Sequence, residues 1–314
     1  MRICCILFAL SVLLFISTDG ANVFVPEKGV RMDTLSGMPE LPLPSVPPEL
    51  QSVPERAAYV LAHFWDGMDF RDTLRSHNKA FIEQNFVNFV SLFPHASGED
   101  RAIAVRLLLK AAEADVPAYR LLAEVAGKYL YDTDSPMLCE EYYILFLEEF
   151  VTASVWDEVG KVRFRYLLEA ARKNRPGTPA ADFTYVTREG KQQTLYGTLG
   201  GNLLLIFYDP ACDYCQEVMT LLRGDVFLCR QVRDKRLTVL AVCVDTDREI
   251  WELTKTDLPA EWITGFDAGN LQEKELYVLS GLPTFYLLDA ARSVVLKEIL
   301  PQVLIPVLTA KLGG

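Results

Sequence analysis

A pair of cysteines directly after an apolar strand constrains the fold of this chain more than any other feature. Leu203–Tyr208 is a continuous apolar run of strand length, and Asp209–Ala211 separates it from the Cys212–Cys215 pair. The pair is therefore predicted to stand in the first turn of the next helix, where unpaired backbone N–H groups and the helix dipole favour a thiolate. Cysteines at positions i and i+3 also share one face of a helix, close enough for a disulfide. The pattern indicates a redox-active pair on an α/β scaffold.

Strand and helix patterns alternate along the C-terminal part, residues 175–314. The breaker-rich segment Asn174–Pro179 marks its start. The predicted strands are Phe183–Val186, Leu203–Tyr208, Leu237–Val244, Thr284–Leu288 and Val294–Ile299. The predicted helices are Cys212–Leu222, Val226–Val232, Arg248–Thr256, Leu271–Leu279 and Val303–Leu312. This order predicts a mixed β-sheet flanked by helices, with a parallel centre and an antiparallel hairpin at one edge.

Residues 55–174 have the periodicity of helices instead. Pro54 stands where a helix can start, and apolar residues follow it at near-helical spacing. Further amphipathic runs are Phe81–Phe93, Arg101–Ala114, Tyr119–Leu130, Leu138–Val151 and Trp156–Ala171. Breaker segments separate them, which is typical of an all-α bundle or of stacked helix hairpins. The chain is thus predicted to be an α+β protein of two domains, with the all-α helical domain first.

The first residues predict export. A positive start, Met1-Arg2, precedes an unbroken run of apolar or small residues from Ile3 to Ile16, and small residues surround Gly20. This is the layout of a secretory signal peptide, residues 1–20, with cleavage after Gly20 and a final location in the periplasm or cell envelope. A membrane anchor, the alternative, needs about 20 apolar residues, more than this run offers. Residues 21–54 are rich in proline and are predicted to form an extended linker.

Charge and cysteine usage argue against several other functions. A net charge of −11 without any basic run argues against nucleic-acid binding, which depends on clustered Lys and Arg. The cysteines after the signal peptide are too few and too irregular for a disulfide-stapled scaffold; they are Cys139, Cys212, Cys215, Cys229 and Cys243. A zinc site would need further ligands, and all three His residues (His63, His77, His95) lie in the helical part. We therefore expect no metal and no bound cofactor.

A second motif carries a resemblance to a known family. The segment Gly281-Leu282-Pro283-Thr284-Phe285 leads into a predicted strand, and Pro179–Phe183 opens the same part of the chain. Together with the cysteine pair, these motifs make residues 178–312 similar to the thioredoxin family, and in particular to its envelope branch. The resemblance implies a thioredoxin fold in which the bond before Pro283 is cis, and in which Leu282 and Pro283 shape the substrate groove.

The resemblance also implies a chemistry and its partners. Cys212 would be the nucleophile that attacks a substrate disulfide, and Cys215 the thiol that resolves the mixed disulfide. The implied substrates are disulfide-containing envelope proteins, and a membrane electron donor is left open. The segment His63-Phe64-Trp65-Asp66 resembles part of a helical domain of unknown function that precedes such modules in bacterial envelope proteins.

Departures from the thioredoxin pattern leave the proton acceptor of Cys215 unidentified. Ile206 stands where thioredoxin has a buried Asp, and Ala211 replaces the Trp that usually precedes the first cysteine. No Pro or His lies between the two cysteines. Acidic residues in the first turns of a helix are candidates for the acceptor, although such residues commonly only favour the helix dipole; they are Asp209, Asp213 and Glu217.

Asp213 and Tyr214, between the cysteines, are expected to tune the thiols. Because the negative charge of Asp213 opposes the stabilisation of a thiolate by the helix dipole, we expect a reductase, with a potential nearer about −200 to −270 mV than the value of about −120 mV of a strong oxidant. Two alternatives are left open. One is a peroxiredoxin-like peroxidase, although the loop before Cys212 lacks that family's peroxide-binding pattern. The other is a scaffold whose helical domain docks a partner.

Overall fold

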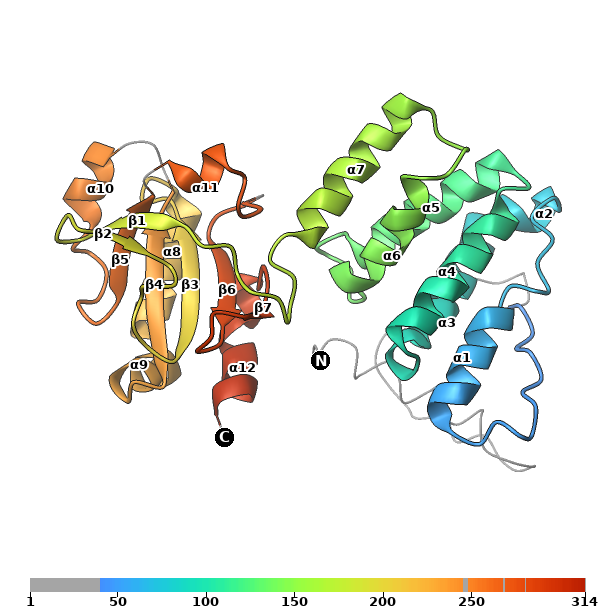
Figure 1. The fold of residues 1–314 in the computed structure, drawn as a ribbon, viewed down its shortest axis with the longest axis horizontal. Helices are drawn as coiled ribbons and strands as arrows, with labels where there is room; N and C mark the ends of the chain where they lie inside the picture. The colour runs from blue at the N-terminus through green and yellow to red at the C-terminus, as the bar shows by residue number, and fades with distance from the viewer. Residues whose placement is uncertain (1–39, 245–247, 268, 280, 314) are drawn as a thin grey trace. The chain divides into compact units, whose positions relative to one another are not determined.

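A computed structural model describes residues 40–244, 248–267, 269–279 and 281–313. The chain divides into two compact units, Met1–Leu168 and Glu169–Gly314 (Figure 1). The first is built of helices and the second around a mixed β-sheet with flanking helices, so the predicted α+β fold class is confirmed. The division falls inside helix α7 (Glu158–Arg172). The domain limits expected from sequence, 55–174 and 175–314, stay predictions, and the predicted signal peptide lies outside the described residues.

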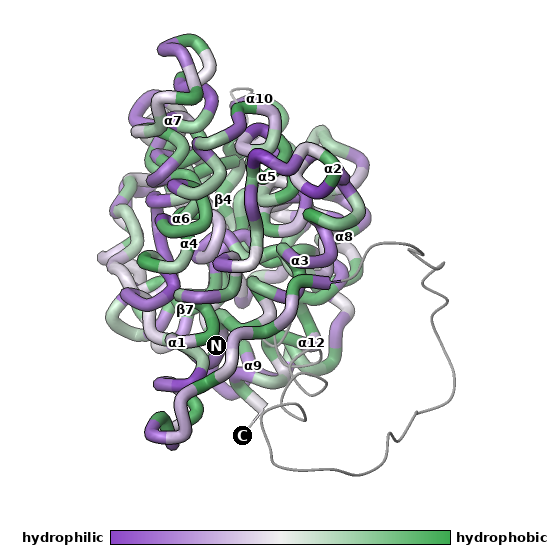
Figure 2. Tube along the Cα trace, turned by 90° about the vertical axis from the view of Figure 1, so that its right-hand side faces the viewer, coloured by the Kyte–Doolittle hydropathy of each residue, from purple (hydrophilic) through white to green (hydrophobic). Residues whose placement is uncertain are grey.

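The helical unit consists of amphipathic helices with well-formed starts. Its elements are α1 (Val53–His63), α2 (Thr73–Ser76), α3 (Lys79–Ser91), the 3₁₀ turn η3 (Phe93–His95), α4 (Gly98–Ala112), α5 (Val116–Leu130), α6 (Glu140–Phe150) and α7. Ser52 with Glu55 forms a capping box at α1, and Ser97 with Asp100 forms another at α4, which satisfies backbone N–H groups that each first turn leaves unpaired. Figure 2 shows the trace of these helices switching between hydrophilic and hydrophobic residues, as expected where each helix buries one side.

Leu41 anchors the segment that precedes α1. Its side chain is buried, and its backbone N–H donates a hydrogen bond to Oδ1 of Asn85 at 2.9 Å. Asn85 is itself buried in α3 and donates to the carbonyl oxygen of Phe81 at 2.8 Å. The described end of the predicted linker, residues 40–52, therefore packs on the helices at Leu41, while residues 21–39 lie outside the described part of the chain.

The second unit is organised by one seven-stranded sheet. Its strands are β1 (Thr184–Thr187), β2 (Gln192–Thr194), β3 (Asn202–Tyr208), β4 (Leu237–Cys243), β5 (Ile263–Asp267), β6 (Thr284–Leu288) and β7 (Val294–Leu296), in the order β2-β1-β5-β4-β3-β6-β7. The three central strands β5, β4 and β3 run parallel, and the outer pairs are antiparallel. The parallel centre and the edge hairpin β6–β7 agree with the sequence prediction.

Alternate residues of β3 contribute to two apolar cores, one on each face of the sheet. Leu204, Ile206 and Tyr208 pack with residues of α8 (Asp213–Gly224), α9 (Val226–Arg233), α10 (Arg248–Thr254) and α12 (Pro301–Leu312). The residues between them face the second core, which includes Leu271 of α11 (Asn270–Glu273). Because both faces of the strand are covered, β3 is apolar from Leu203 onward, which explains why its sequence is a continuous hydrophobic run rather than an alternating one.

The sequence misses β2 and β5 and predicts α11 to be too long. The three residues of β2 are polar, so no apolar alternation marks them. Gly265 stands in the middle of β5, where glycine normally weakens a strand, but a Cβ at this position would come within 2.5 Å of the buried Tyr185 ring. Helix α11 ends at Glu273, although apolar residues continue to Leu279, because Tyr277 is buried outside the helix and its hydroxyl donates to the carbonyl oxygen of Ala181.

Candidate active site

Cys212 caps the start of α8, directly after β3 ends. Its backbone is extended, and its Sγ accepts a hydrogen bond from the backbone N–H of Cys215 at 3.4 Å. Asp209 closes the connecting turn, because its carbonyl oxygen accepts from the N–H of Cys212 at 3.3 Å and its Oδ1 accepts from the N–H of Ala211 at 2.7 Å. The half-buried Cys212 sulfur is thus held where a helix start stabilises a thiolate.

Cys215 lies one helical turn further on and has the opposite environment. Its side chain is only 1% exposed, and both cysteines are thiols rather than a disulfide in this structure. Burial raises the pKa of the Cys215 thiol to about 12; the neighbouring Cys212 and the charge of Asp209 act in the same direction, whereas a hydrogen bond with the Asp209 backbone acts against it. The pair therefore combines an accessible sulfur with a buried one that holds its proton at neutral pH.

The Leu282–Pro283 peptide bond is cis and stands directly before β6. Strand β6 runs antiparallel to β3, with Thr284 opposite Phe207, so Pro283 lies beside the end of β3 from which the cysteine pair follows. Pro283 is buried, and the half-buried Leu282 packs against the core that contains Cys215. The strand register thus brings two motifs that are distant in the sequence to the same end of the sheet.

The two residues between the cysteines are both exposed. Asp213 is the first residue of α8. The Tyr214 side chain is 44% exposed, and its hydroxyl accepts a hydrogen bond at 3.3 Å from Nε2 of Gln302, in the first turn of α12. This contact holds the start of α12 next to the start of α8 and fixes an aromatic ring on the surface beside Cys212.

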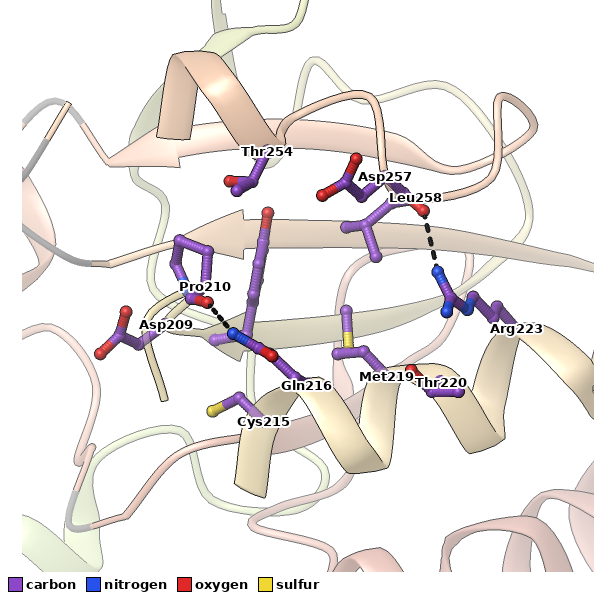
Figure 3. Close-up of a pocket in the computed structure, with 11 residues that line it drawn as sticks. Asp209, Pro210, Cys215, Gln216, Met219, Thr220, Arg223, Thr254, Asp257 and Leu258 are labelled. Atoms are coloured by element: carbon purple, nitrogen blue, oxygen red, sulfur yellow. Dashed lines mark hydrogen bonds between the residues drawn. The ribbon is translucent and has the colours of Figure 1, made fainter. Parts of the chain in front are cut away.

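A cavity of about 400 Å³ lies on the inner side of the cysteine pair. Figure 3 shows it between α8 and the end of α10, with Cys215 and Asp209 at one end and Asp257 on the opposite wall. Two hydrogen bonds join its walls: Gln216 Nε2 donates to the carbonyl oxygen of Pro210 at 2.8 Å, and the Arg223 guanidinium donates to that of Asp257 at 3.3 Å. The cavity is large enough to bring water to a thiol that is otherwise enclosed by the core.

The structure separates the three carboxylates that the sequence offers as proton acceptors. Asp209 lines the cavity together with Cys215, whereas Asp213 and Glu217 are exposed and do not line it. Sequence reasoning missed the other polar walls, for instance Asp257, because no motif or periodicity links the connection between α10 and β5 to the cysteine pair. The cavity could be found only from the packing of α8 over the sheet.

The other described cysteines belong to other elements of the fold. Cys243 is fully buried at the end of β4, and Cys139 precedes α6 in the helical unit. The half-buried Cys229 on α9 donates from its sulfur to the carbonyl oxygen of Arg223 at 3.3 Å. Within the described ranges, no three His, Cys, Asp or Glu side chains are grouped so that they could hold a metal ion.

Residues 19–174 match a protein family described as a domain of unknown function, DUF5106. A search of the curated proteins finds no match. Among solved structures, a thioredoxin-like protein from Bacteroides caccae is 33% identical; the match covers 87% of this chain and 99% of that chain, with a TM-score of 0.74. This match extends over both units, and it supports a thioredoxin-like redox role at the level of the family and the fold.

Two further solved structures match part of the chain. A conserved protein of unknown function from Bacteroides fragilis is 35% identical, with 43% of this chain and 98% of that chain covered and a TM-score of 0.41. The thioredoxin domain of a thiol-disulfide oxidoreductase from Bacteroides vulgatus is 20% identical, with 44% and 98% covered and a TM-score of 0.38.

The burial of Cys215 predicts a loss of stability at alkaline pH. The folded thiol keeps its proton up to a pKa of about 12, whereas the unfolded thiol titrates near 9.0, so the unfolded state alone loses this proton as the pH rises between the two values. In the reduced protein, the free energy of unfolding should therefore fall more steeply for wild type than for Cys215→Ser from about pH 8 to about pH 10.5, measured by urea denaturation. Parallel decreases in the two proteins would contradict the assigned burial.

Proposed function

The chain belongs to the thioredoxin-like proteins, and we propose that it is an exported thiol–disulfide oxidoreductase that reduces protein disulfides of the cell envelope through Cys212 and Cys215. One observation carries this proposal: an accessible sulfur caps α8, while a second sulfur one turn later is buried and protonated. An exchange reaction needs this difference, because one thiol must meet the partner while the other waits for the mixed disulfide.

The reaction begins at Cys212. Its thiolate, stabilised by the Cys215 N–H and the helix start, attacks one sulfur of the substrate disulfide and releases the other as a thiolate. Cys215 then attacks Sγ of Cys212 and releases the second substrate sulfur. The substrate disulfide gains two electrons, and the enzyme dithiol becomes the Cys212–Cys215 disulfide, which an external electron donor must reduce again.

The surface around Cys212 supports a protein substrate. Leu282 precedes the cis bond, and an extended substrate segment could pair with its backbone in the manner of an added strand. The exposed Tyr214 ring, which lies between the two cysteines in the sequence, adds an apolar contact. Disulfide-containing envelope proteins fit this surface, and a membrane-bound donor would complete the cycle.

The direction of electron flow follows from the groups around Cys212. A strong oxidant needs a strongly stabilised thiolate, which adjacent cationic side chains commonly provide. Here the hydrogen bond to Cys212 Sγ in the described part of the chain comes from the backbone N–H of Cys215, at 3.4 Å, and the adjacent residue on α8 is the acidic Asp213. This environment favours a reducing couple.

Export is supported by the sequence of residues 1–20, which has the positive start, apolar run and small-residue cleavage site of a signal peptide. Among the residues that the structure describes, no helix combines the length and the apolar character needed to cross a bilayer. From the signal sequence alone, we assign the mature chain, from Ala21 onward, to the periplasm or cell envelope.

Substitution of the two cysteines should separate the two steps of exchange. In the mature full-length chain, Cys212→Ser should abolish insulin disulfide reduction, because it removes the nucleophile. Cys215→Ser should also stop turnover but should leave Cys212 covalently bound to substrate, because resolution is blocked. Trapped partners would be identified by mass spectrometry after release with dithiothreitol.

Cys229→Ser is the matched control, since it removes a half-buried thiol outside the pair and should leave the rate unchanged. Equal rates for wild type and Cys212→Ser would instead support a scaffold without redox activity. Peroxide turnover that survives Cys215→Ser would support a peroxidase.

The redox potential should identify the protein as a reductase. Equilibration of the Cys212–Cys215 couple with glutathione buffers, followed by thiol alkylation, should give a midpoint between about −200 and −270 mV. Asp213→Asn should raise this value slightly, because it removes a negative charge beside the Cys212 thiolate and thereby favours the reduced form. A wild-type value above about −150 mV would overturn the proposed direction.

Expression in a Gram-negative host should test export. The chain should be recovered from the periplasmic fraction with Ala21 as its first residue, as read from the intact mass. Leu13→Arg interrupts the apolar run of the signal and should leave the protein unprocessed in the cytoplasm. Recovery of an uncleaved wild-type chain in the membrane fraction would show that the segment is an anchor instead.

A further inference from the structure

Resolution of the mixed disulfide requires Cys215 to lose its proton, and the structure makes this loss difficult. The thiol is 1% exposed, and burial raises its pKa to about 12. Near neutral pH only a very small fraction of such a thiol is ionised, and the thiol form does not attack a disulfide. A nearby base would remove this barrier if it took the proton during the attack.

The lining of the cavity determines which ionisable groups are candidates for accepting the proton of Cys215. Among the described residues, the ionisable side chains that line the cavity besides Cys215 are Tyr208 at the end of β3, Asp209 in the connecting turn, Arg223 on α8 and Asp257 after α10. The Cys212 thiol, which caps α8, also interacts with Cys215. Burial raises the pKa of Tyr208, so this phenol stays neutral and is no base. Two carboxylates are therefore left.

We propose that the carboxylate of Asp209 accepts the proton of Cys215 through the cavity, as the general base of the resolving step. Three observations support the assignment. Asp209 and Cys215 both line the cavity, and they lie at the same end of it (Figure 3). Its Oδ1 is fixed at 2.7 Å from the N–H of Ala211, and its backbone carbonyl is bound to the N–H of Cys212. Asp209 and the two thiols thus lie within the hydrogen-bonded turn and the first helical turn that follows it.

Electrostatics lower the cost of the transfer at the moment of attack. The negative charge of Asp209 raises the pKa of Cys215, while a hydrogen bond with the Asp209 backbone stabilises the Cys215 thiolate. Moving the proton from sulfur to the carboxylate removes the repulsion and keeps the hydrogen bond. Asp257 is not among the groups that shift the pKa of Cys215, and it lies on the opposite wall (Figure 3).

This proton transfer rests on the proposed exchange reaction. The Cys215 S–H bond breaks, and its proton goes to Asp209. The sulfur electron pair forms the Cys215–Cys212 bond, and the bond between Cys212 and the substrate sulfur breaks. The substrate leaves as a thiolate, and the proton on Asp209 passes to this thiolate or to water, so that the carboxylate is restored.

The test follows the two steps separately in the reduced mature chain carrying Cys229→Ser. Reaction with 5,5′-dithiobis(2-nitrobenzoate) in a stopped-flow instrument should release two equivalents of the yellow thiolate. The first comes from attack by Cys212, and the second comes from resolution by Cys215. Asp209→Asn keeps the Oδ1 contact with Ala211 but cannot accept a proton. It should slow the second phase at least about tenfold at neutral pH and change the first less than about twofold.

Two further readouts separate a base from a structural residue. In Asp209→Asn, the second-phase rate should rise about tenfold per pH unit, because solvent base must then remove the proton. A ¹³Cβ titration of Cys215 should at the same time show a lower pKa, because a negative charge is gone. A residue that acted only through its charge would make resolution faster, so a more acidic thiol that resolves more slowly identifies a base.

Asp257→Asn is the matched control, since it changes the other cavity carboxylate and leaves the backbone carbonyl that binds Arg223. It should leave both phases unchanged. A second phase that is unchanged or faster in Asp209→Asn, or one that Asp257→Asn slows equally, would overturn the assignment. Release of a single equivalent by the wild-type pair would overturn the dithiol function itself, so the two failures are distinguishable.

Discussion

The site depends on the point at which β3 ends and α8 begins. Tyr208 is the last residue of the strand and is buried, and the following turn brings the chain back over the apolar face of the sheet. The first sulfur therefore stands at the rim of the core and the second inside it. Two identical side chains acquire unlike chemistry from one helical turn, because burial favours the neutral form of a thiol and a helix start favours the charged form.

The pairing of β3 with β6 adds the second half of the site. The two strands are antiparallel, so the beginning of β6 is aligned with the end of β3. The cis peptide bond, which immediately precedes β6, therefore lies beside the cysteine turn, which immediately follows β3. The covered faces of the sheet stabilise this register, since a slip of one residue would turn the apolar side chains of β3 from one core to the other.

Local sequence patterns predicted the elements that bury a continuous apolar face. They failed for the features whose formation depends on tertiary contacts. The run Leu203–Tyr208 and the cysteine pair after it are visible in the sequence because burial on both faces and helix capping leave chemical signatures. Strand β5 is not, since Gly265 lowers its strand propensity and is explained only by the Tyr185 ring that packs against it. The cavity beside Cys215 could not be predicted from the sequence either, because its far wall comes from the connection between α10 and β5, which carries no motif.

The position of Asp209 accounts for the most conspicuous departure from the thioredoxin pattern. Ile206 occupies the place of the buried acid and is completely enclosed in the core of α8, α9, α10 and α12. A carboxylate there would have to be desolvated among apolar side chains, at a cost of several kcal/mol unless it were paired or protonated. After the end of the strand, the Asp209 residue borders the cavity, its carboxylate accepts a hydrogen bond from the Ala211 N–H, and its charge acts on Cys215. An apolar strand and an acidic turn can therefore share the task that one buried acid performs elsewhere, and the turn that starts the helix also positions the base.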